Sequence, residues 1–347
     1  MRVIVTGGSG FIGSAVIRLI LAETDWRVLN VDRLGYAAVA EPCPPGLDRG
    51  RYGLVQADIR DRASMAQILA GFDPDLVIHA AAETHVDRSI DGPAAFVETN
   101  MLGTFAMLEA ARAHWAARPR TGVRFHLVST DEVFGSLEDG EPAFGDRSPI
   151  LPNSPYAASK AGADHLVRAW GRTYGLPVSI TRGCNTLGPW QFPEKLVPLM
   201  TIAAMERRPL PLYGDGLNRR EWLHVDDHAR AILAATAGPA GGCWPIGAGG
   251  DRTNREVVEA ICDTVDALLP DARGSRRMLV RTVPDRPGHD RRYAMDDSRT
   301  RDALGWRPRH DFASALASTV RWYLENAGWW RRIRATSYGG ERLGLTA

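Results

Sequence analysis

The stretch Val3-Ile4-Val5-Thr6-Gly7-Gly8-Ser9-Gly10-Phe11-Ile12-Gly13 joins an apolar, β-branched run to a turn rich in glycine. A helical pattern follows over residues 11–23. Glycines placed between a strand and a helix let the backbone approach a pyrophosphate, while free N–H groups at the start of the helix bind the anion. The stretch therefore predicts a dinucleotide site, with Gly7, Gly10 and Gly13 forming the turn.

A second predicted strand covers residues 27–31 and ends at Asp32, 19 residues beyond Gly13. A carboxylate at this position accepts hydrogen bonds from the hydroxyls of an adenosine ribose. It also repels a 2′-phosphate, so the expected cofactor is NAD rather than its 2′-phosphorylated form. Arg33, the neighbouring cation, is the one feature here that favours the phosphorylated form.

Strand and helix patterns alternate as far as residue 182. Further strands are expected over residues 52–57, 75–79, 124–128 and 178–182, and further helices over residues 60–69, 93–118 and from Tyr156 onward. Such alternation is typical of an α/β protein with a parallel sheet. From residue 183, short apolar runs and turns with Pro or Gly replace this alternation.

The expected fold is therefore α/β, a Rossmann-type doubly wound parallel sheet with a smaller C-terminal cap that binds the substrate. Residues 1–182 form the expected NAD-binding domain, with further elements contributed from about residues 220–240. Residues 183–330 form most of the expected cap, and residues 331–347 form a polar tail.

Composition excludes several classes of function. The chain has 347 residues, 44% of them apolar, and its net charge of +1 gives no general attraction for nucleic acid. No apolar run approaches the length of a membrane span. The four cysteines lack the spacing of a metal site, so no metal is expected, and the first residues have the pattern of a strand rather than of a signal peptide. The expected compartment is the cytoplasm.

Tyr156 and Lys160 stand four residues apart in a segment with a helical pattern, so their side chains share one face of the helix. A cation beside a phenol lowers the pKa of the phenol, and such a tyrosine can act as a base on an alcohol. The spacing alone is common in helices. The scarcity of lysine adds weight, because Lys160 and Lys195 are the only lysines among 42 basic residues. We therefore expect both lysines to lie at a site.

A hydroxyl and two carboxylates follow the predicted strand over residues 124–128, in the run Ser129-Thr130-Asp131-Glu132. Parallel α/β sheets bind ligands beyond the carboxyl ends of their strands, so this run is well placed to meet Tyr156 across a ligand. A polar loop that caps a helix is the ordinary alternative. Arginine-rich loops over residues 214–222 and 283–293 similarly indicate either a pyrophosphate pocket or surface salt bridges.

Six motifs taken together resemble one family, the nucleotide-sugar branch of the extended short-chain dehydrogenase/reductases. They are Thr6-Gly-Gly-Ser-Gly-Phe-Ile-Gly13, Ala81-Ala-Glu-Thr-His-Val-Asp-Arg-Ser89, Ser129-Thr-Asp-Glu-Val-Phe-Gly135, Tyr156-x-x-x-Lys160, Phe192-Pro-Glu-Lys195 and Arg286-Pro-Gly-His-Asp-Arg-Arg-Tyr293. The resemblance extends from Met1 to about Asn326. The adjacent acids Asp131 and Glu132 make the chain most similar to members that dehydrate a nucleoside-diphosphate glucose, with dTDP-glucose as the expected substrate.

The resemblance implies a mechanism. Tyr156 removes the proton from the sugar C4 hydroxyl, Thr130 hydrogen-bonds the same oxygen, and NAD⁺ takes the C4 hydride. Glu132 takes the C5 proton and Asp131 gives a proton to the departing C6 hydroxyl, before the hydride returns to C6. Neighbouring carboxyls suit these roles, because close acids resist ionising together. Lys160 holds the nicotinamide ribose and keeps the pKa of Tyr156 low.

The resemblance also implies which residues bind the ligands. The expected cofactor residues, besides the three glycines, Asp32, Arg33, Tyr156 and Lys160, are Phe11, Ile12, Asp58, Ile59, Ala80, Ala82 and Thr99. The expected residues for the sugar nucleotide, besides Thr130, are Thr84, Asn185, Lys195, Arg220, Asn254, Arg286, His289 and Tyr293. Members of the family usually pair the long helices that carry Asn100 and Tyr156, so a homodimer is expected.

The chain departs from the family pattern at four positions, none of which is a proposed catalytic group. They are Thr186 for Asn, Leu187 for an aromatic residue, Glu221 for Asp and Phe134 for Tyr. Two alternative functions stay open. One is a UDP-sugar 4-epimerase or decarboxylase of the same family, in which Asp131 and Glu132 take no part. The other is a non-catalytic NAD-binding protein.

Overall fold

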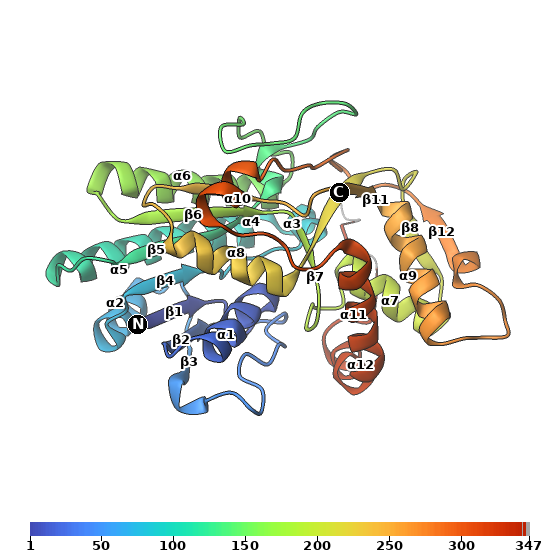
Figure 1. The fold of residues 1–347 in the computed structure, drawn as a ribbon, viewed down its shortest axis with the longest axis horizontal. Helices are drawn as coiled ribbons and strands as arrows, with labels where there is room; N and C mark the ends of the chain where they lie inside the picture. Colours follow the sequence, from blue (N-terminus) through green and yellow to red (C-terminus); the bar gives the residue numbers. More distant parts are fainter. Residues whose placement is uncertain (342, 345–347) are drawn as a thin grey trace.

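The computed structural model describes residues 1–341, 343 and 344, and its largest feature is a seven-stranded parallel sheet (Figure 1). The strands lie in the order β10-β6-β5-β4-β1-β2-β3. After β1 the chain adds β2 and β3 on one side and then β4, β5 and β6 on the other, so the strand order switches sides between β1 and β4. Their bounds are β1 (Arg2–Thr6), β2 (Arg27–Asp32), β3 (Tyr52–Gln56), β4 (Leu76–His79), β5 (Arg124–Thr130), β6 (Val178–Gly183) and β10 (Cys243–Ile246). The predicted Rossmann-type doubly wound sheet is confirmed.

Helices cover both faces of this sheet because its strands are apolar on both sides (Figure 1). Ile4 of β1 packs with the helices of one face, and its neighbours Val3 and Val5 pack with the helices of the other. The first face carries α2 (Arg62–Phe72), α5 (Thr104–Ala117) and α6 (Pro155–Tyr174), and the second carries α1 (Phe11–Glu23) and α8 (Val225–Ala237).

The helix predicted over residues 93–118 is interrupted. A short α4 (Pro93–Phe96) leads into a π-helical segment, η2 (Val97–Gly103), before α5 begins. In this segment the Asn100 side chain bonds both backbone groups of Glu83, as a neighbouring strand would. Its amide oxygen accepts from the Glu83 N–H at 2.8 Å, and its amide nitrogen donates to the Glu83 carbonyl at 3.0 Å. Widened helical turns of this kind often occur at functional sites. Here the turn anchors the polar segment that follows β4.

Two elements from late in the chain complete the large sheet. Helix α8 packs beside α1, and β10 pairs with β6 from Cys243 opposite Ile180 to Ile246 opposite Gly183. The chain therefore enters the cap after β6, returns to the sheet, and leaves it again. The division of the chain at residue 182 stays a prediction.

The cap consists of two small sheets packed against three helices, on the right of Figure 1. Val197, Ile261 and Val320, from three different helices, share its apolar core. The sheets have the orders β11-β9-β7 and β12-β8. Its elements are β7 (Asn185–Leu187), α7 (Leu196–Met205), β8 (Leu210–Tyr213), β9 (Arg219–His224), β11 (Asp251–Thr253), α9 (Asn254–Leu268), β12 (Val280–Val283) and α11 (Phe312–Glu325), with α10 (Ser298–Leu304) packing on β10.

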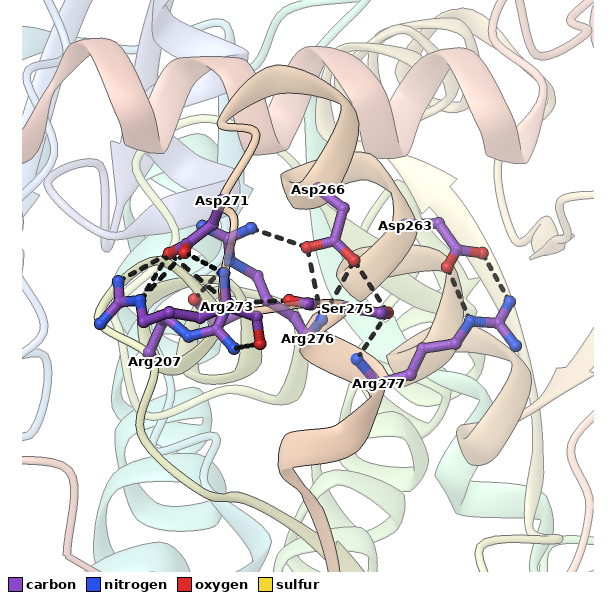
Figure 2. Close-up of polar contacts among 10 residues, drawn as sticks. Arg207, Asp263, Asp266, Asp271, Arg273, Ser275, Arg276 and Arg277 are labelled. Carbon is purple, nitrogen blue, oxygen red and sulfur yellow. Dashed lines mark hydrogen bonds and ion pairs between the residues drawn. The ribbon is translucent and has the colours of Figure 1, made fainter.

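Ion pairs hold the connection between α9 and β12 (Figure 2). Arg276 donates to the carboxylate of Asp266 at 2.7 Å and to the Ala204 carbonyl of α7 at 2.8 Å. Arg277 pairs with Asp263 on the exposed side of α9. These contacts fix the start of β12, and so they fix the strand from which the loop over residues 284–293 departs.

The end of the chain packs on the rest of the molecule. Helix α12 (Ala327–Thr336) buries Trp330 and Ile333, and Trp329 donates its indole N–H to the Val39 carbonyl at 2.9 Å. The predicted polar tail thus begins inside a helix, and its residues 342 and 345–347 lie outside the described residues. Among the described helices, none combines the length and apolarity that crossing a bilayer requires.

A buried ion pair joins α6 to β6, and breaking it should destabilise the fold. Asp164 accepts from Nε of Arg182 at 2.8 Å, and neither side chain is more than 2% exposed. Asp164→Ala leaves the guanidinium buried without its carboxylate, so the free energy of unfolding should fall by about 3–5 kcal/mol in urea titrations followed by circular dichroism. Asp263→Ala, which breaks the exposed pair with Arg277, is the control, and equal losses in the two variants would contradict the explanation.

Candidate active site

A cavity of about 440 Å³ lies between the large sheet and the cap, beyond the carboxyl ends of β1, β2, β4, β5 and β6. The residues predicted to react or to bind ligands line this one cavity, with the exception of Lys160. Those that line it are Gly7, Gly10, Phe11, Ile12, Gly13, Asp32, Arg33, Asp58, Ile59, Ala80, Ala82, Thr84, Thr99, Thr130, Asp131, Glu132, Tyr156, Asn185, Lys195, Arg220, Asn254, Arg286, His289 and Tyr293.

The glycine turn after β1 has no room for side chains. Gly7 has a φ of +70°, and a Cβ there would lie 2.6 Å from the Cα of Ala81. A Cβ on Gly13 would lie 2.3 Å from the carbonyl oxygen of Gly7. Helix α1 starts directly after Gly10, and no side chain caps its first turn within the described residues. Bare backbone and uncapped N–H groups at one wall of the cavity fit a pyrophosphate.

Backbone contacts fix the carboxylate at the end of β2. Asp32 accepts from the N–H of Ser9 at 2.9 Å and from that of Leu34 at 2.8 Å, and it keeps further lone pairs for a ribose. Arg33, the cation that favoured a 2′-phosphate, forms an ion pair with Glu83. The arrangement fits an adenosine ribose with free hydroxyls.

Tyr156 and Lys160 lie one turn apart in α6, and burial dominates the protonation of both. The ammonium of Lys160 donates to the Val128 carbonyl at 2.8 Å, and burial lowers the pKa of Lys160 to about 8, opposed by Asp164. Burial raises the pKa of Tyr156 well above its usual value, and the charge of Glu132 adds to this shift. The direction differs from the lowering expected from the sequence, because desolvation of the phenol outweighs the contacts that favour its ionised form.

The two acids at the end of β5 have different surroundings. Asp131 is 1% exposed; its Oδ1 accepts from the Thr130 hydroxyl at 3.2 Å, and its Oδ2 has no partner in the described part of the chain. Burial raises the pKa of Asp131 well above its usual value, and the charge of Glu132 raises it further. Burial also raises the pKa of Glu132, but three cations oppose that shift: Arg286, Arg220 and Lys195. Asp131 therefore holds a proton more readily than Glu132 does.

On the cap side, the predicted substrate residues are held by neighbours in the loop over residues 284–293. Arg220 of β9 lies 4.1 Å from the ring centroid of Tyr293 and donates to the Asp290 carbonyl at 2.7 Å. His289 donates to the carboxylate of Asp285 at 2.6 Å, and burial lowers the pKa of His289 to about 4. These contacts direct a cation and two ring side chains at one wall of the cavity.

Three of the departures from the family pattern have structural partners. Glu221 accepts from the N–H groups of Ala248 at 2.6 Å and Met295 at 3.0 Å, so it joins β9 to two cap loops. The ring of Phe134 stacks on Phe144 in the core, at a centroid distance of 4.9 Å. The hydroxyl of Thr186 lies 2.9 Å from Nδ1 of His228. A fourth, Leu187, is buried in the cap core.

Several residues of the cavity wall were not predicted from the sequence as site residues. They are polar or aromatic side chains brought in by distant segments, namely Tyr36, Asp87, Ser129, Gln191, Glu194, Tyr213, Trp222 and His228. Glu194 and Asp87 stand inside quoted motifs, but spacing alone does not say what they contact. Their partners come from segments more than 100 residues away.

Comparison with known proteins agrees with this geometry. Residues 4–319 match the family model described as GDP-mannose 4,6 dehydratase. The dTDP-glucose 4,6-dehydratase of Neisseria meningitidis is 49% identical, over 99% of each chain, and that of Escherichia coli is 47% identical, also over 99% of each.

Solved structures give the same result. DesIV, the dTDP-glucose 4,6-dehydratase of Streptomyces venezuelae solved with NAD bound, is 44% identical, with a TM-score of 0.85 over 96% of this chain and 100% of that one. The UDP-glucose 4-epimerase of Thermus thermophilus, in complex with NAD, is 31% identical, with a TM-score of 0.81 over 94% and 100%.

The buried acid should cost stability at high pH. Because the pKa of Asp131 is raised in the folded state, the folded chain binds more protons than the unfolded chain above about pH 4, the usual pKa of an aspartate, and its stability falls as pH rises. Asp131→Asn removes this loss. Its melting temperature should exceed that of the wild type near pH 8, and the advantage should disappear toward about pH 4.

Asp215→Asn is the control, because the N–H of Leu217 lowers the pKa of Asp215 and the sign is reversed. That variant should show no gain in melting temperature near neutral pH. An Asp131→Asn protein that melts at or below the wild-type temperature across the whole range would contradict a buried, proton-holding Asp131.

Proposed function

Because the chain belongs to the GDP-mannose 4,6 dehydratase family, we propose that it removes water from dTDP-glucose to give the 4-keto-6-deoxy sugar. It is an NAD-dependent dehydratase of the extended short-chain dehydrogenase/reductase type. The observation that carries the proposal is a pair of acids, the buried Asp131 and the partly buried Glu132, in the same cavity as Tyr156 and the glycine turn. Oxidation of an alcohol alone has no use for that pair.

The residues of the large-sheet half fit NAD. Gly7, Gly10 and Gly13 leave room for the pyrophosphate, and Asp32 accepts from the adenosine ribose. Ala80, Ala82 and the other predicted cofactor residues form the remaining wall. The chemistry that bound NAD supplies is removal of a hydride from C4 and its return to C6. We propose accordingly that residues 1–182, with further elements from about residues 220–240, bind the cofactor, and that the cap, mainly residues 183–330, binds the sugar nucleotide.

The protein's own side chains move the protons. Tyr156 takes the proton of the C4 hydroxyl, and Thr130 donates a hydrogen bond to that oxygen. Because burial disfavours the phenolate of Tyr156, the positive charges of Lys160 and of bound NAD⁺ would have to favour that form for the step to occur. Glu132 removes the proton from C5, which the new C4 ketone has acidified, and gives it back to C5 when the hydride adds to C6. Asp131 gives its proton to the C6 hydroxyl, which leaves as water with the electrons of the C6–O bond. Lys160 contacts the nicotinamide ribose in this scheme, moving from the Val128 carbonyl that it bonds here.

The electrostatics of the two acids suit one acid and one base. Burial and the charge of Glu132 keep the proton on Asp131, which must donate it. Arg286, Arg220 and Lys195 favour the ionised form of Glu132, which must accept one. Two adjacent carboxyls with separated pKa values can divide the roles of acid and base within one elimination.

We propose two further properties. A cytoplasmic location fits two observations. The four cysteines are free thiols in the structure, and the similar proteins come from bacteria. A homodimer fits the apolar surface on the outer side of η2 and α6, where Val97, Leu102 and Tyr174 are about half exposed. Helices α5 and α6 lie side by side at one end of the molecule, so a second copy could pack there through the same surface (Figure 1).

The test of the reaction is incubation with dTDP-glucose, with the product mass measured by mass spectrometry. The wild type should give a product lighter by one water. Glu132→Gln should lower the rate by about 10²–10⁴-fold, the usual contribution of a positioned base, while the amount of bound NAD stays unchanged. Glu138→Gln, which alters an exposed glutamate in the following loop, is the control and should keep the wild-type rate.

The same assay separates the alternatives. A product of unchanged mass would identify a 4-epimerase, and loss of carbon dioxide from a UDP-sugar acid would identify a decarboxylase. Bound NAD without turnover of any nucleotide-activated sugar would identify a non-catalytic protein. An unchanged rate in Glu132→Gln would contradict its role as the C5 base.

The dimer is tested by light scattering after size-exclusion chromatography. The wild type should have twice the 37.9 kDa mass of the chain. Leu102→Glu places a charge on the proposed apolar interface and should give monomers. Leu269→Glu, at an exposed leucine of the cap, should remain dimeric. A monomeric wild type would contradict the proposal.

A further inference from the structure

The polar segment Thr84–Arg88 follows β4 and includes the first turn of the short helix α3 (Val86–Asp91), and its Asp87 and Arg88 side chains pair with the cap. We call it the bridging segment. Of its residues, only Thr84 is predicted above to contact a ligand. Its contacts involve two of the three cap cations predicted to bind the sugar nucleotide, Lys195 and Arg286.

Asp87 is the partner of Arg286, 199 residues away in the sequence. Its Oδ1 accepts from Nη1 of Arg286 at 2.9 Å, and its Oδ2 accepts from the Tyr213 hydroxyl at 3.3 Å. The Asp87 side chain is 7% exposed. The Nε of Arg286 is buried with no partner in the described residues, and the guanidinium lines the cavity. One end of Arg286 is thus fixed, and the rest is left for a ligand.

Arg88, the next residue, is the partner of Glu194. Its Nε donates to the carboxylate at 2.9 Å, and the other carboxylate oxygen accepts from the Tyr36 hydroxyl at 3.0 Å. The guanidinium of Arg88 also lies 4.3 Å from the ring centroid of Tyr36. Glu194 directly precedes Lys195, whose ammonium donates to the Thr84 carbonyl at 2.6 Å. The bridging segment therefore holds Lys195 both directly and through its neighbour.

The two ion pairs have opposite polarity, since the bridging segment supplies an acid to Arg286 and a base to Glu194. Exchange of partners between the pairs would set like charges together, so this order fixes which cap loop meets which residue. Buried ion pairs are a weak source of stability, because desolvation offsets their attraction. Their position at the cavity points to another role. Arg286, Lys195 and Glu132 line the same cavity, and the charges of both cations lower the pKa of Glu132 against the effect of burial.

We propose that Asp87 and Arg88 are positioning residues for the substrate: Asp87 orients Arg286, and Arg88 acts through Glu194 to orient Lys195, so that both cations meet the sugar nucleotide. The inference rests on the proposed function, because it takes the ligand of these cations to be a nucleoside-diphosphate sugar. It assigns to the bridging segment the alignment of the cap on the cofactor half of the protein.

The effect of Asp87→Asn on dTDP affinity tests the role of Asp87, because electrostatics and positioning predict opposite directions. Asp87→Asn removes a negative charge near a site for an anion, so simple electrostatics predicts tighter binding of dTDP. Loss of positioning predicts the opposite, weaker binding by about tenfold, the equivalent of one charged hydrogen bond. Isothermal titration of the NAD-loaded protein with dTDP measures it. Weaker dTDP binding with unchanged bound NAD supports the proposal, and equal or tighter binding overturns it.

The ion pair of Arg88 and Glu194 is tested by a double-mutant cycle. This second test can still contradict the proposal if the Asp87 variant folds poorly. Arg88→Met and Glu194→Gln should each weaken dTDP binding. The double variant should bind dTDP no more weakly than the weaker-binding of the two single variants, because each substitution breaks the same ion pair. Losses that multiply in the double variant would show independent effects and would overturn the role of Arg88 through Glu194.

The matched control lies in the cap, away from the cavity (Figure 2). Asp266→Asn removes the same charge from another aspartate–arginine pair, so it should lower the melting temperature while dTDP binding stays within twofold of the wild type. If Asp266→Asn weakens dTDP binding as much as Asp87→Asn does, the effect is a general loosening of the cap and the proposal is wrong. Failure of the wild type to dehydrate dTDP-glucose would contradict the proposed function, and the dTDP titrations would still decide the positioning roles.

Discussion

The placing of two adjacent carboxyls at the end of β5, with Asp131 buried and Glu132 partly buried, is the constraint on which the site depends. Two acids out of water repel each other and favour their neutral forms, so the pair would be inert without compensation. The cap supplies that compensation unequally: the charge of Arg220 lowers the pKa of both acids, and Arg286 and Lys195 add to this effect at Glu132. The difference between an acid and a base at neighbouring positions thus comes from where the cap places its cations.

The cap has to be held accurately, and the large sheet provides the reference. Thr130 and Gly183 are opposite each other in the register of β5 and β6, so the Thr130 hydroxyl and the residue at which the chain leaves β6 for the cap lie at the same edge of the sheet. The bridging segment adds a second attachment, from the end of β4. Other arginines, such as Arg51 and Arg277, pair with acids at more exposed positions, where ion pairs contribute little to stability. The few that are buried join elements that must keep their relative positions.

Strand and helix patterns in the sequence were enough to predict the features that depend only on neighbouring residues. The glycine turn, Asp32 and the helix of Tyr156 and Lys160 follow from strand and helix periods, and the structure contains them where they were expected. The sequence could not indicate that Lys160 bonds the Val128 carbonyl, or that burial reverses the expected shift of Tyr156, since both depend on packing. The π-helical turn at Asn100 depends on Glu83, and the pairs of Asp87 and Arg88 depend on residues far along the chain.

The last strand of the large sheet, β10, comes from residues 243–246, after much of the cap has been made. During synthesis from the N-terminus, β6 is therefore an open edge, and the apolar side of α1 lacks α8, until residues well beyond β9 have left the ribosome. Pairing elements so distant in sequence is slow. The cofactor-binding half and the cap consequently mature as one folding unit, and a nascent chain stopped within the cap presents an unpaired strand to its neighbours.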